Sequence, residues 1–183
     1  MLRRKLQLVL VVLLCLAGSA LTLSVFTGTV KVFRIPTNGM APTIRAGDYL
    51  LATRVFSPEK SVKAGDLVIF DSHRAHPTLG SKYVQRLVAI GGDRIEVIGG
   101  QLHVNGVRLP EREGLFAAPA PHTFSRFPAV TYPLVIPPGQ IFTLGDNYGN
   151  SLDSRYFGPF PVDAVTHTPD CILFPAGRAG KLD

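Results

Sequence analysis

Two threonine hydroxyls near the start of the sequence could act as nucleophiles, and a few basic groups further along could accept their proton. Thr37 and Thr43 lie in the stretch IPTNGMAPTIRAGDYLLA, and the candidate bases Lys82, His73 and His76 lie downstream. A hydroxyl attacks well at neutral pH only when a neighbouring base takes its proton. Because a histidine in a polar loop such as DSHRAHPTLGSKY is usually only solvated, a hydroxyl–histidine pair has little support.

Metal and thiol chemistry have less support still. Asp71 lies close to His73 and His76, but no fourth ligand at a tight spacing completes a metal site. Cys171, in PDCILFP, has no neighbouring base and is predicted to be a small buried hydrophobic residue. Cys15 lies in an apolar N-terminal segment, so a disulfide with Cys171 is not expected. The sequence therefore predicts no metal ion and no cofactor.

Composition limits the classes of protein to which the chain can belong. Its 183 residues suffice for one domain with a sizeable core, and 18 glycines and 15 prolines make it rich in turns. The net charge is +6, of which Arg3, Arg4 and Lys5 supply half. No cluster of basic residues interleaved with aromatic residues is found, so nucleic-acid binding is not expected.

The N-terminus predicts a membrane anchor. Residues 6–26 are almost all apolar, and about 20 helical residues cross a hydrocarbon core of about 30 Å. The basic residues 1–5 would hold the N-terminus in the cytoplasm and place residues 27–183 on the outer, periplasmic or extracellular, side. A cleaved signal peptide is the alternative because Gly18 and Ala20 are small, but the apolar run continues beyond them. Length therefore favours a single-pass anchor in the cytoplasmic (inner) membrane.

Beyond residue 26 the pattern is one of short strands and tight turns. DYLLATRVF, GDLVIFD, QIFTL and CILF are β-prone runs, and RIEVIGGQLHV predicts a hairpin because a Gly-Gly pair accepts positive φ. Asn105-Gly106 predicts a second tight turn, and prolines are spread too widely for long helices. Residues 111–133 are predicted to be an irregular excursion of the same domain. The expected fold class is therefore mainly β, with antiparallel strands.

Several separated blocks together resemble the type I signal peptidases, the family of the bacterial leader peptidase. NGMAPTIRAGDYLL is similar to the family's nucleophile block, which reads roughly Ser-Met-x-Pro-Thr followed by Gly-Asp. GDLVIF, YVQRLVAIGGDRIEV and QLHVNG are similar to the next strand, the general-base block and the hairpin after it. PPGQIFTLGDNYGNSLDSRYFGPF is similar to the family's Gly-Asp-Asn block. The resemblance covers most of the chain and implies a largely antiparallel β domain close to the membrane, where it would bind extended precursor segments.

The resemblance also implies a serine nucleophile and a lysine base, and this sequence has neither at the matching positions. Gly39 stands in the serine position and Gln85 in the lysine position. Gly39 has no side chain, and the Gln85 amide is no base at physiological pH. The family's oxyanion hole corresponds here to the Gly39 N–H and the Thr37 hydroxyl, which can both still donate hydrogen bonds. On a strand, Tyr83, Gln85 and Leu87 would share one face, so Gln85 is expected to point into the wall of the site.

Other residues of the resembling blocks are expected to bind peptide or to support the site. They are Met40, Pro42, Tyr83, Arg86, Asp146, Asn147, Ser151, Asp153 and Arg155. Ser151 matches the serine that supports the family's lysine, whereas an Asp/Arg pair beside tight turns is more often a structural network. Tyr148 and Gly149 depart from the Arg-Asp that is usual in this block.

Three hypotheses about function remain open. The first is a membrane protein of this family that has lost Ser/Lys catalysis and binds extended segments of exported or secreted precursor proteins. The second is an active precursor-processing endopeptidase with a displaced nucleophile and base, although Lys82 is expected on the strand side opposite to Gln85. The third is a structural β domain tethered to the membrane. The first is favoured because Gly39 and Gln85 interrupt otherwise matching blocks.

Overall fold

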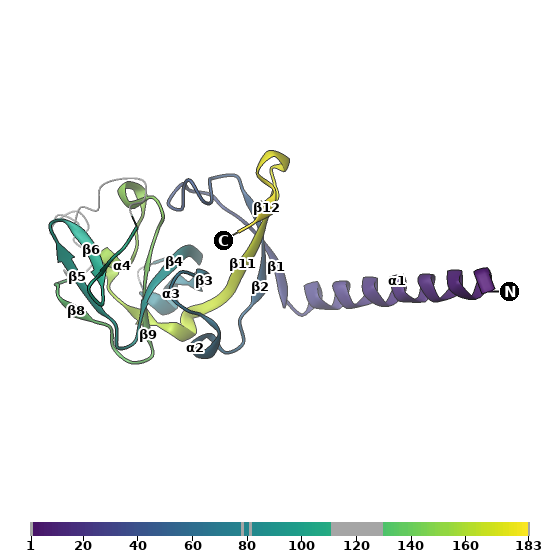
Figure 1. The fold of residues 1–183 in the computed structure, drawn as a ribbon, viewed down its shortest axis with the longest axis horizontal. Coiled ribbons are helices and arrows are strands. Elements are labelled where there is room, and N and C mark those ends of the chain that lie inside the picture. The colour runs from purple at the N-terminus through teal and green to yellow at the C-terminus, as the bar shows by residue number, and fades with distance from the viewer. Residues whose placement is uncertain (1, 78, 81, 111–129, 183) are drawn as a thin grey trace.

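Helix α1 (Leu2–Phe26) projects from one end of a β domain (Figure 1). The computed structural model describes residues 2–77, 79–80, 82–110 and 130–182. Among these residues, no helix was found that is both long and apolar enough to cross a membrane. The N-terminal helix α1 is present, whereas the membrane anchor in 6–26 stays a prediction.

The domain is built from short strands joined by turns and single helical turns. The strands are β1 (Val30–Arg34), β2 (Tyr49–Arg54), β3 (Leu67–Asp71), β4 (Lys82–Ile90), β5 (Arg94–Ile98), β6 (Gln101–Val104), β7 (Val107–Arg108), β8 (Leu134–Val135), β9 (Gln140–Leu144), β10 (Phe160–Pro161), β11 (Val165–Phe174) and β12 (Gly180–Lys181). The helical turns are α2 (Pro58–Ser61), α3 (Ser72–Ala75), α4 (Ser154–Phe157), η1 (Tyr148–Asn150), η2 (Val162–Ala164) and η3 (Ala176–Arg178). The expected mainly β fold is confirmed.

Most of these strands form one antiparallel sheet in the order β1-β2-β11-β3-β4-β9-β10, with β12 paired to β11. β11 pairs with both β2 and β3, and β4 pairs with β3 and β9. Four antiparallel pairings separate β1 from β4, so these two strands run in the same direction. Residues of both β1 and β4 line the groove described below.

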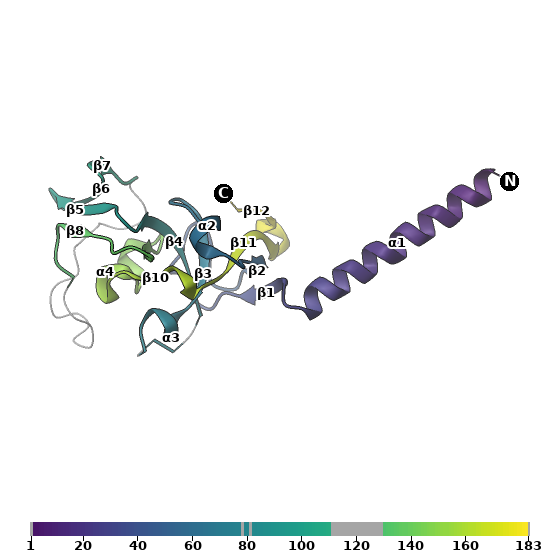
Figure 2. The ribbon, with the colours of Figure 1, turned by 90° about the horizontal axis from the view of Figure 1, so that it is seen from below.

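A second sheet, in the order β7-β6-β5-β8, contains both predicted turns. Gly99 and Gly100 join β5 to β6 with φ of 58° and 75°, and Asn105 and Gly106 join β6 to β7 with φ of 51° and 79°. Positive φ at both central residues is what a type I′ hairpin turn requires, so both predictions are confirmed. This sheet lies at the end of the domain away from α1 (Figure 2).

Three apolar clusters fill the domain. One surrounds Phe70 and Phe160 on the first sheet, and a second surrounds Phe142, where the two sheets meet. A third surrounds Ile44, which is fully buried between β1 and β2 in sequence. Burial of an apolar side chain of this size contributes about 1.5–3 kcal/mol. The third cluster therefore fixes the segment that carries Gly39.

The β-prone runs predicted from the sequence are all strands, with one difference in extent. CILF is only the end of the ten-residue strand β11. Cys171 on β11 is half-buried rather than fully buried, because alternation along the strand gives the buried position to Ile172. The excursion predicted in 111–133 falls mostly outside the described residues.

Candidate functional site

A groove with a volume of about 700 Å³ lies between the segment that includes and follows β1, the start of β4 and the turn before α4. Its lining comprises residues 33–37, 39–40, 69, 82–85, 149–152 and 156. The predicted site residues Thr37, Gly39, Met40, Tyr83, Gln85 and Ser151 all belong to this lining. The structure thus brings together residues that are up to 114 positions apart in the sequence (Thr37 and Ser151).

Gly39 lies where the segment after β1 meets the segment after β9. Its carbonyl oxygen accepts a hydrogen bond from the Asn147 N–H at 3.1 Å. A Cβ added at Gly39 would find the Asn150 carbonyl oxygen at 3.4 Å and Ser151 Oγ at 3.8 Å, which are ordinary contact distances. A Cβ at Gly145 would instead collide with Ser151 Oγ and the Gly39 carbonyl oxygen. Close packing therefore requires glycine at position 145 and leaves room for a side chain at position 39.

Two residues of this part of the lining carry hydrogen-bond donors. Thr37 is exposed, and its hydroxyl lies on a residue of the groove lining. The Gly39 N–H donates to no acceptor within the described part of the chain. Both groups can therefore donate to a carbonyl or carboxylate oxygen of a bound peptide.

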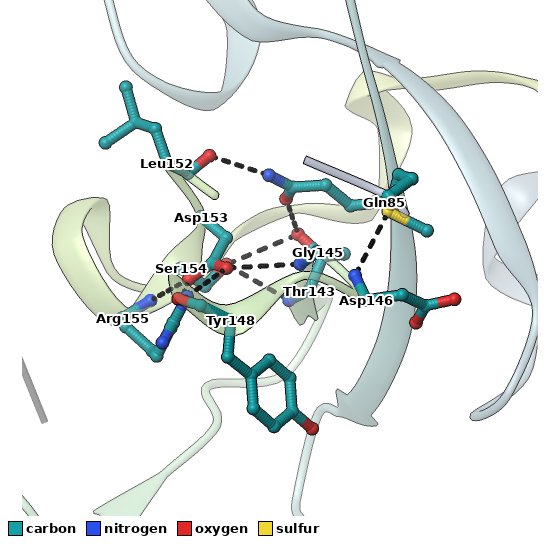
Figure 3. Close-up of polar contacts among 10 residues, drawn as sticks. Gln85, Thr143, Gly145, Asp146, Tyr148, Leu152, Asp153, Ser154 and Arg155 are labelled. Carbon is teal, nitrogen blue, oxygen red and sulfur yellow. Dashed lines mark hydrogen bonds and ion pairs between the residues drawn. The ribbon is translucent and has the colours of Figure 1, made fainter. Parts of the chain in front are cut away.

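The Gln85 side chain is 2 % exposed, and both ends of its amide are occupied by the protein itself (Figure 3). Nε2 donates to the Leu152 carbonyl oxygen at 2.7 Å, and Oε1 accepts from the Thr143 hydroxyl at 2.6 Å. Ser154 Oγ extends this network by accepting the Thr143 N–H at 3.0 Å. As expected from strand alternation, Gln85 lies in the wall of the groove, where its amide is fully hydrogen-bonded.

Asp146 is also buried, but it is not a lining residue of the groove. Arg86 Nε and Nη2 donate to its two carboxylate oxygens at 3.0 and 2.9 Å, and Thr43 Oγ1 donates at 2.6 Å. The Asp146 N–H points to the sulfur of Met40 at 3.4 Å. A bidentate Arg–carboxylate pair has a fixed geometry, so this cluster ties β4 to the segment that carries Gly39. The Thr43 hydroxyl is engaged in this cluster.

Asp153 and Arg155 form a second buried ion pair (Figure 3). Arg155 Nε and Nη2 each lie 2.8 Å from an Asp153 carboxylate oxygen, and Nη2 also donates to the Tyr148 carbonyl oxygen at 2.8 Å. Burial alone would lower the pKa of Arg155, but the Asp153 carboxylate outweighs it and raises that pKa. Asp153 also accepts the Gly145 N–H at 3.1 Å. The pair therefore holds the turn that carries Ser151 and has no direct access to the groove.

Five further candidate positions remain, of which only Lys82 belongs to the groove lining. Pro42 and Asn147 are not lining residues, although the Asn147 amide donates to the Asn38 carbonyl oxygen at 3.2 Å. Lys82 was predicted on the strand side opposite to Gln85, but it lines the same groove, and its Nζ lies 3.9 Å from Asp71 Oδ2. His73 and His76 do not line it, and the described residues contain no group of three or more His, Cys, Asp or Glu that could hold a metal ion.

Sequence reasoning missed one ion pair that shapes the site. Arg178, near the C-terminus, donates from Nε and Nη2 to the buried carboxylate of Asp48 at 2.9–3.2 Å, and from Nη2 to the Thr43 carbonyl oxygen at 3.0 Å. Burial opposes ionisation of Asp48, but hydrogen bonds from Arg178 and the Arg45 N–H prevail and lower its pKa. Asp48 belongs to the Gly-Asp part of the first block, whereas no local signal marks Arg178 as its partner.

Comparison with known proteins agrees with the resemblance. The model of the family "Signal peptidase, peptidase S26" matches residues 3–174. Signal peptidase I of Leptolyngbya laminosa is 25% identical over 166 residues, which cover 88% of this chain and 77% of that protein. Probable signal peptidase I-1 of Synechocystis sp. is 31% identical over 157 residues, which cover 81% and 73%.

A solved structure is also similar in sequence. A signal peptidase I from Enterococcus faecalis V583 is 28% identical, with a TM-score of 0.42, and the match covers 58% of this chain and 94% of that one. The family model spans nearly the whole chain and includes every residue of the groove lining. The chain therefore belongs to the signal peptidase family, peptidase S26.

Proposed function

We propose that this chain is a membrane-anchored member of the signal peptidase family that lacks Ser/Lys catalysis and binds extended segments of exported precursor proteins. The observation that carries the proposal is the pair Gly39 and Gln85 in the wall of one groove, at the positions where the resemblance expects nucleophile and base. Gly39 offers no attacking atom. Gln85 offers no general base that could take the proton of a hydroxyl. Its amide already makes hydrogen bonds with Leu152 and Thr143.

The expected loss of rate is large. Removal of the nucleophile alone in a comparable serine hydrolase lowers kcat by about 10⁶-fold. This corresponds to about 8 kcal/mol of activation free energy, at about 1.4 kcal/mol for each tenfold. Donors such as the Gly39 N–H and the Thr37 hydroxyl stabilise an oxyanion only after an attack has occurred, so they do not replace the nucleophile.

Peptide binding is supported by the strand edges beside the groove. β1 ends its sheet and pairs only with β2 among the described strands. In β4, residues 82–85 pair with β3 on one side, while pairing with β9 begins at Arg86. One backbone edge of each strand is therefore left for an extended peptide, which can bind by adding main-chain hydrogen bonds.

The N-terminal segment gives the proposal its location. Residues 6–26 would anchor the chain once in the cytoplasmic membrane, with residues 1–5 in the cytoplasm and the domain on the outer side. There the groove would meet exported or secreted precursor proteins. The proposal requires no cofactor and no nucleic acid.

Reconstruction of the dyad tests the loss of catalysis. Gly39→Ser has room because the nearest atoms to a Cβ are at 3.4 Å or more, and a Gln85→Lys ammonium could donate to the Leu152 carbonyl and the Thr143 hydroxyl. The full chain in detergent should not cleave a labelled precursor peptide with small residues before the cleavage point, and the double variant should cleave it. Each single variant is the matched control. Equal cleavage by the unmodified chain and the double variant would falsify the proposed loss of catalysis.

Peptide binding is tested separately by calorimetry with the same peptide, which the unmodified chain should bind. If the chain binds no peptide, the third hypothesis, a structural tethered domain, replaces this part of the proposal.

An active enzyme with displaced groups is the second candidate, because Thr37 and Lys82 line the same groove as Gly39. This candidate predicts that the unmodified chain cleaves the peptide and that Thr37→Ala and Lys82→Ala each abolish the cleavage. Turnover that both variants leave unchanged would exclude these two residues as nucleophile and base.

A further inference from the structure

The charged residues of the groove lining have one sign. Among the lining residues, Arg34 and Lys82 are cationic, and none is an aspartate or glutamate. Much of the remaining lining is apolar, as at Phe33 and Ile69. A groove with low-dielectric walls and charges of one sign raises the local concentration of ligands of the opposite sign.

Each cation precedes Gly39 or Gln85 along its own wall of the groove. Arg34, the last residue of β1, lies five residues before Gly39, and Lys82, the first residue of β4, lies three residues before Gln85. At no more than about 3.3 Å per residue, Lys82 lies within roughly 10 Å of Gln85 and Arg34 within roughly 16 Å of Gly39.

Neither cation is strongly neutralised. Lys82 Nζ is 3.9 Å from Asp71 Oδ2, and both side chains are more than a third exposed, so this pair is weak. Arg34 is exposed and makes no ion pair with any described residue. Both guanidinium and ammonium groups are therefore available to a carboxylate in the groove.

We infer that the groove prefers extended peptides that carry an acidic side chain three to five residues from the residue that lies against Gly39. The inference rests on the proposed peptide binding and specifies the class of peptide. An acidic side chain at that distance would reach Arg34 and Lys82, while the rest of the peptide would contact the apolar lining. Charge complementarity of this kind contributes selectivity rather than most of the affinity.

His167 lies behind the apolar lining of the groove, where a charge of the groove wall affects its pKa. It lies on β11, with its ring 5.0 Å from that of Phe33, which lines the groove. Burial lowers its pKa, a contact with the Gly28 backbone raises it, and the charges of Lys82, Lys31 and Arg54 lower it further. The cations that affect His167 thus come from β1, β2 and β4, and Lys82 among them lines the groove.

Binding of matched peptides to the full chain in neutral detergent tests the inference. The probe is a fluorescein-labelled nine-residue peptide of valine, threonine and alanine, with a single glutamate placed at each position in turn. The reference carries glutamine at the same position. Anisotropy at pH 7 should show one region of the peptide where glutamate binds about fivefold more tightly than glutamine.

The variants locate the preference. Arg34→Gln and Lys82→Gln should each reduce the ratio of the affinity for the glutamate peptide to the affinity for the glutamine peptide. Lys63→Gln removes one exposed positive charge outside the lining and should leave the preference intact. In ¹H NMR titrations, the glutamate peptide should raise the pKa of His167 relative to the glutamine peptide, because a bound anion offsets the field of Lys82.

Each failure has its own signature. If no peptide of the series binds, the proposed peptide binding itself fails. Equal binding of glutamate and glutamine peptides at every position, or a preference that survives in both groove variants, would overturn the inference alone. It would also be overturned if Arg34→Gln weakened association with phosphatidylglycerol vesicles and left peptide selectivity unchanged, since the cations would then serve a lipid surface.

Discussion

Gly39 and Gly145 both lie close to Ser151, but packing constrains only one of them to be glycine. Gly145 is in contact with Ser151 and the Gly39 carbonyl group, so it has no space for even a methyl group. Gly39 has that space, and its φ is outside the left-handed region. Neither packing nor backbone conformation therefore requires glycine at position 39.

Alanine substitutions should separate the two positions. Gly145→Ala should lower the free energy of unfolding by about 1–3 kcal/mol, because the added Cβ overpacks a contact between two backbone segments. Gly39→Ala should be neutral or slightly stabilising, since a less flexible residue reduces the entropy of the unfolded chain. Thermal and denaturant unfolding of the full chain in detergent measure both.

The double variant Gly145→Ala/Ser151→Gly is the control. It removes the collision with Ser151 and leaves the one with the Gly39 carbonyl, so it should regain only part of the loss. Equal stability of the two alanine variants would contradict the packing described here.

Gln85 fits its site because a neutral amide has both a donor and an acceptor. Leu152 supplies a carbonyl acceptor and Thr143 a hydroxyl donor, so burial leaves neither end of the amide unsatisfied. A charged ammonium at the same depth would lose far more hydration free energy. The side chain is thus suited to a buried position in the groove wall.

At the scale of elements, two ion pairs hold the segment between β1 and β2 from opposite sides. Arg86 on β4 reaches it through Asp146 and Thr43. Arg178, in η3 near the C-terminus, reaches it through Asp48. The groove wall that carries Gly39 therefore depends on side chains that are distant in sequence.

Removal of Arg178 should change how stability depends on pH. The pKa of Asp48 lies below its usual value near 3.8, so ionised Asp48 stabilises the fold at pH values above this and loses that contribution as the pH falls through the lowered pKa. Arg178→Met should therefore cost about 2 kcal/mol at pH 7, because a buried carboxylate loses its charged partner. As the pH falls through the lowered pKa of Asp48, the difference from the unmodified chain should shrink, because Asp48 becomes protonated in both.

Denaturant unfolding at a series of pH values checks this expectation. The matched control is Arg74→Met, which breaks an ion pair whose side chains are 56% and 63% exposed and should change little. A loss for Arg178→Met that stays the same down to the lowest pH at which the unmodified chain is folded would show that packing, rather than the charge of Asp48, is responsible.

Short sequence patterns were sufficient to predict the tight turns and the orientation of Gln85 on β4. The Gly99-Gly100 and Asn105-Gly106 turns follow from the φ values that only such pairs adopt readily. Alternation along β4 placed Gln85 in the wall for a similar reason. β11 was predicted only over its last residues, because His167 and Pro169 interrupt the apolar pattern although both are buried. Arg178 could not be foreseen, since its partner Asp48 is 130 residues away and only the tertiary fold brings them together.

At the scale of the whole molecule, the groove and helix α1 lie close along the chain. β1 begins at Val30, four residues after α1 ends at Phe26. The junction is hydrogen-bonded: the Thr29 N–H donates to the Ser24 carbonyl at 2.9 Å, and the Arg54 N–H to the Thr29 carbonyl at 2.7 Å. A membrane that held α1 would therefore hold the start of β1 near its surface.

The anchor itself is tested by charges in the middle of α1. Val11 and Leu14 are exposed on the helix, 56% and 64%, and make no contact that the domain depends on. An aspartate near the centre of a membrane-spanning helix costs about 2.5–3.5 kcal/mol, so Val11→Asp with Leu14→Asp should move the chain from the membrane fraction to the soluble fraction. Val11→Leu with Leu14→Val is the apolar control and should stay in the membrane after alkaline carbonate extraction.

Since the substitutions lie outside the β domain, peptide binding by the released chain should be unchanged, which separates loss of anchoring from loss of folding. An unmodified chain that carbonate extracts, or a doubly charged variant that remains in the membrane, would contradict a single-pass anchor at 6–26.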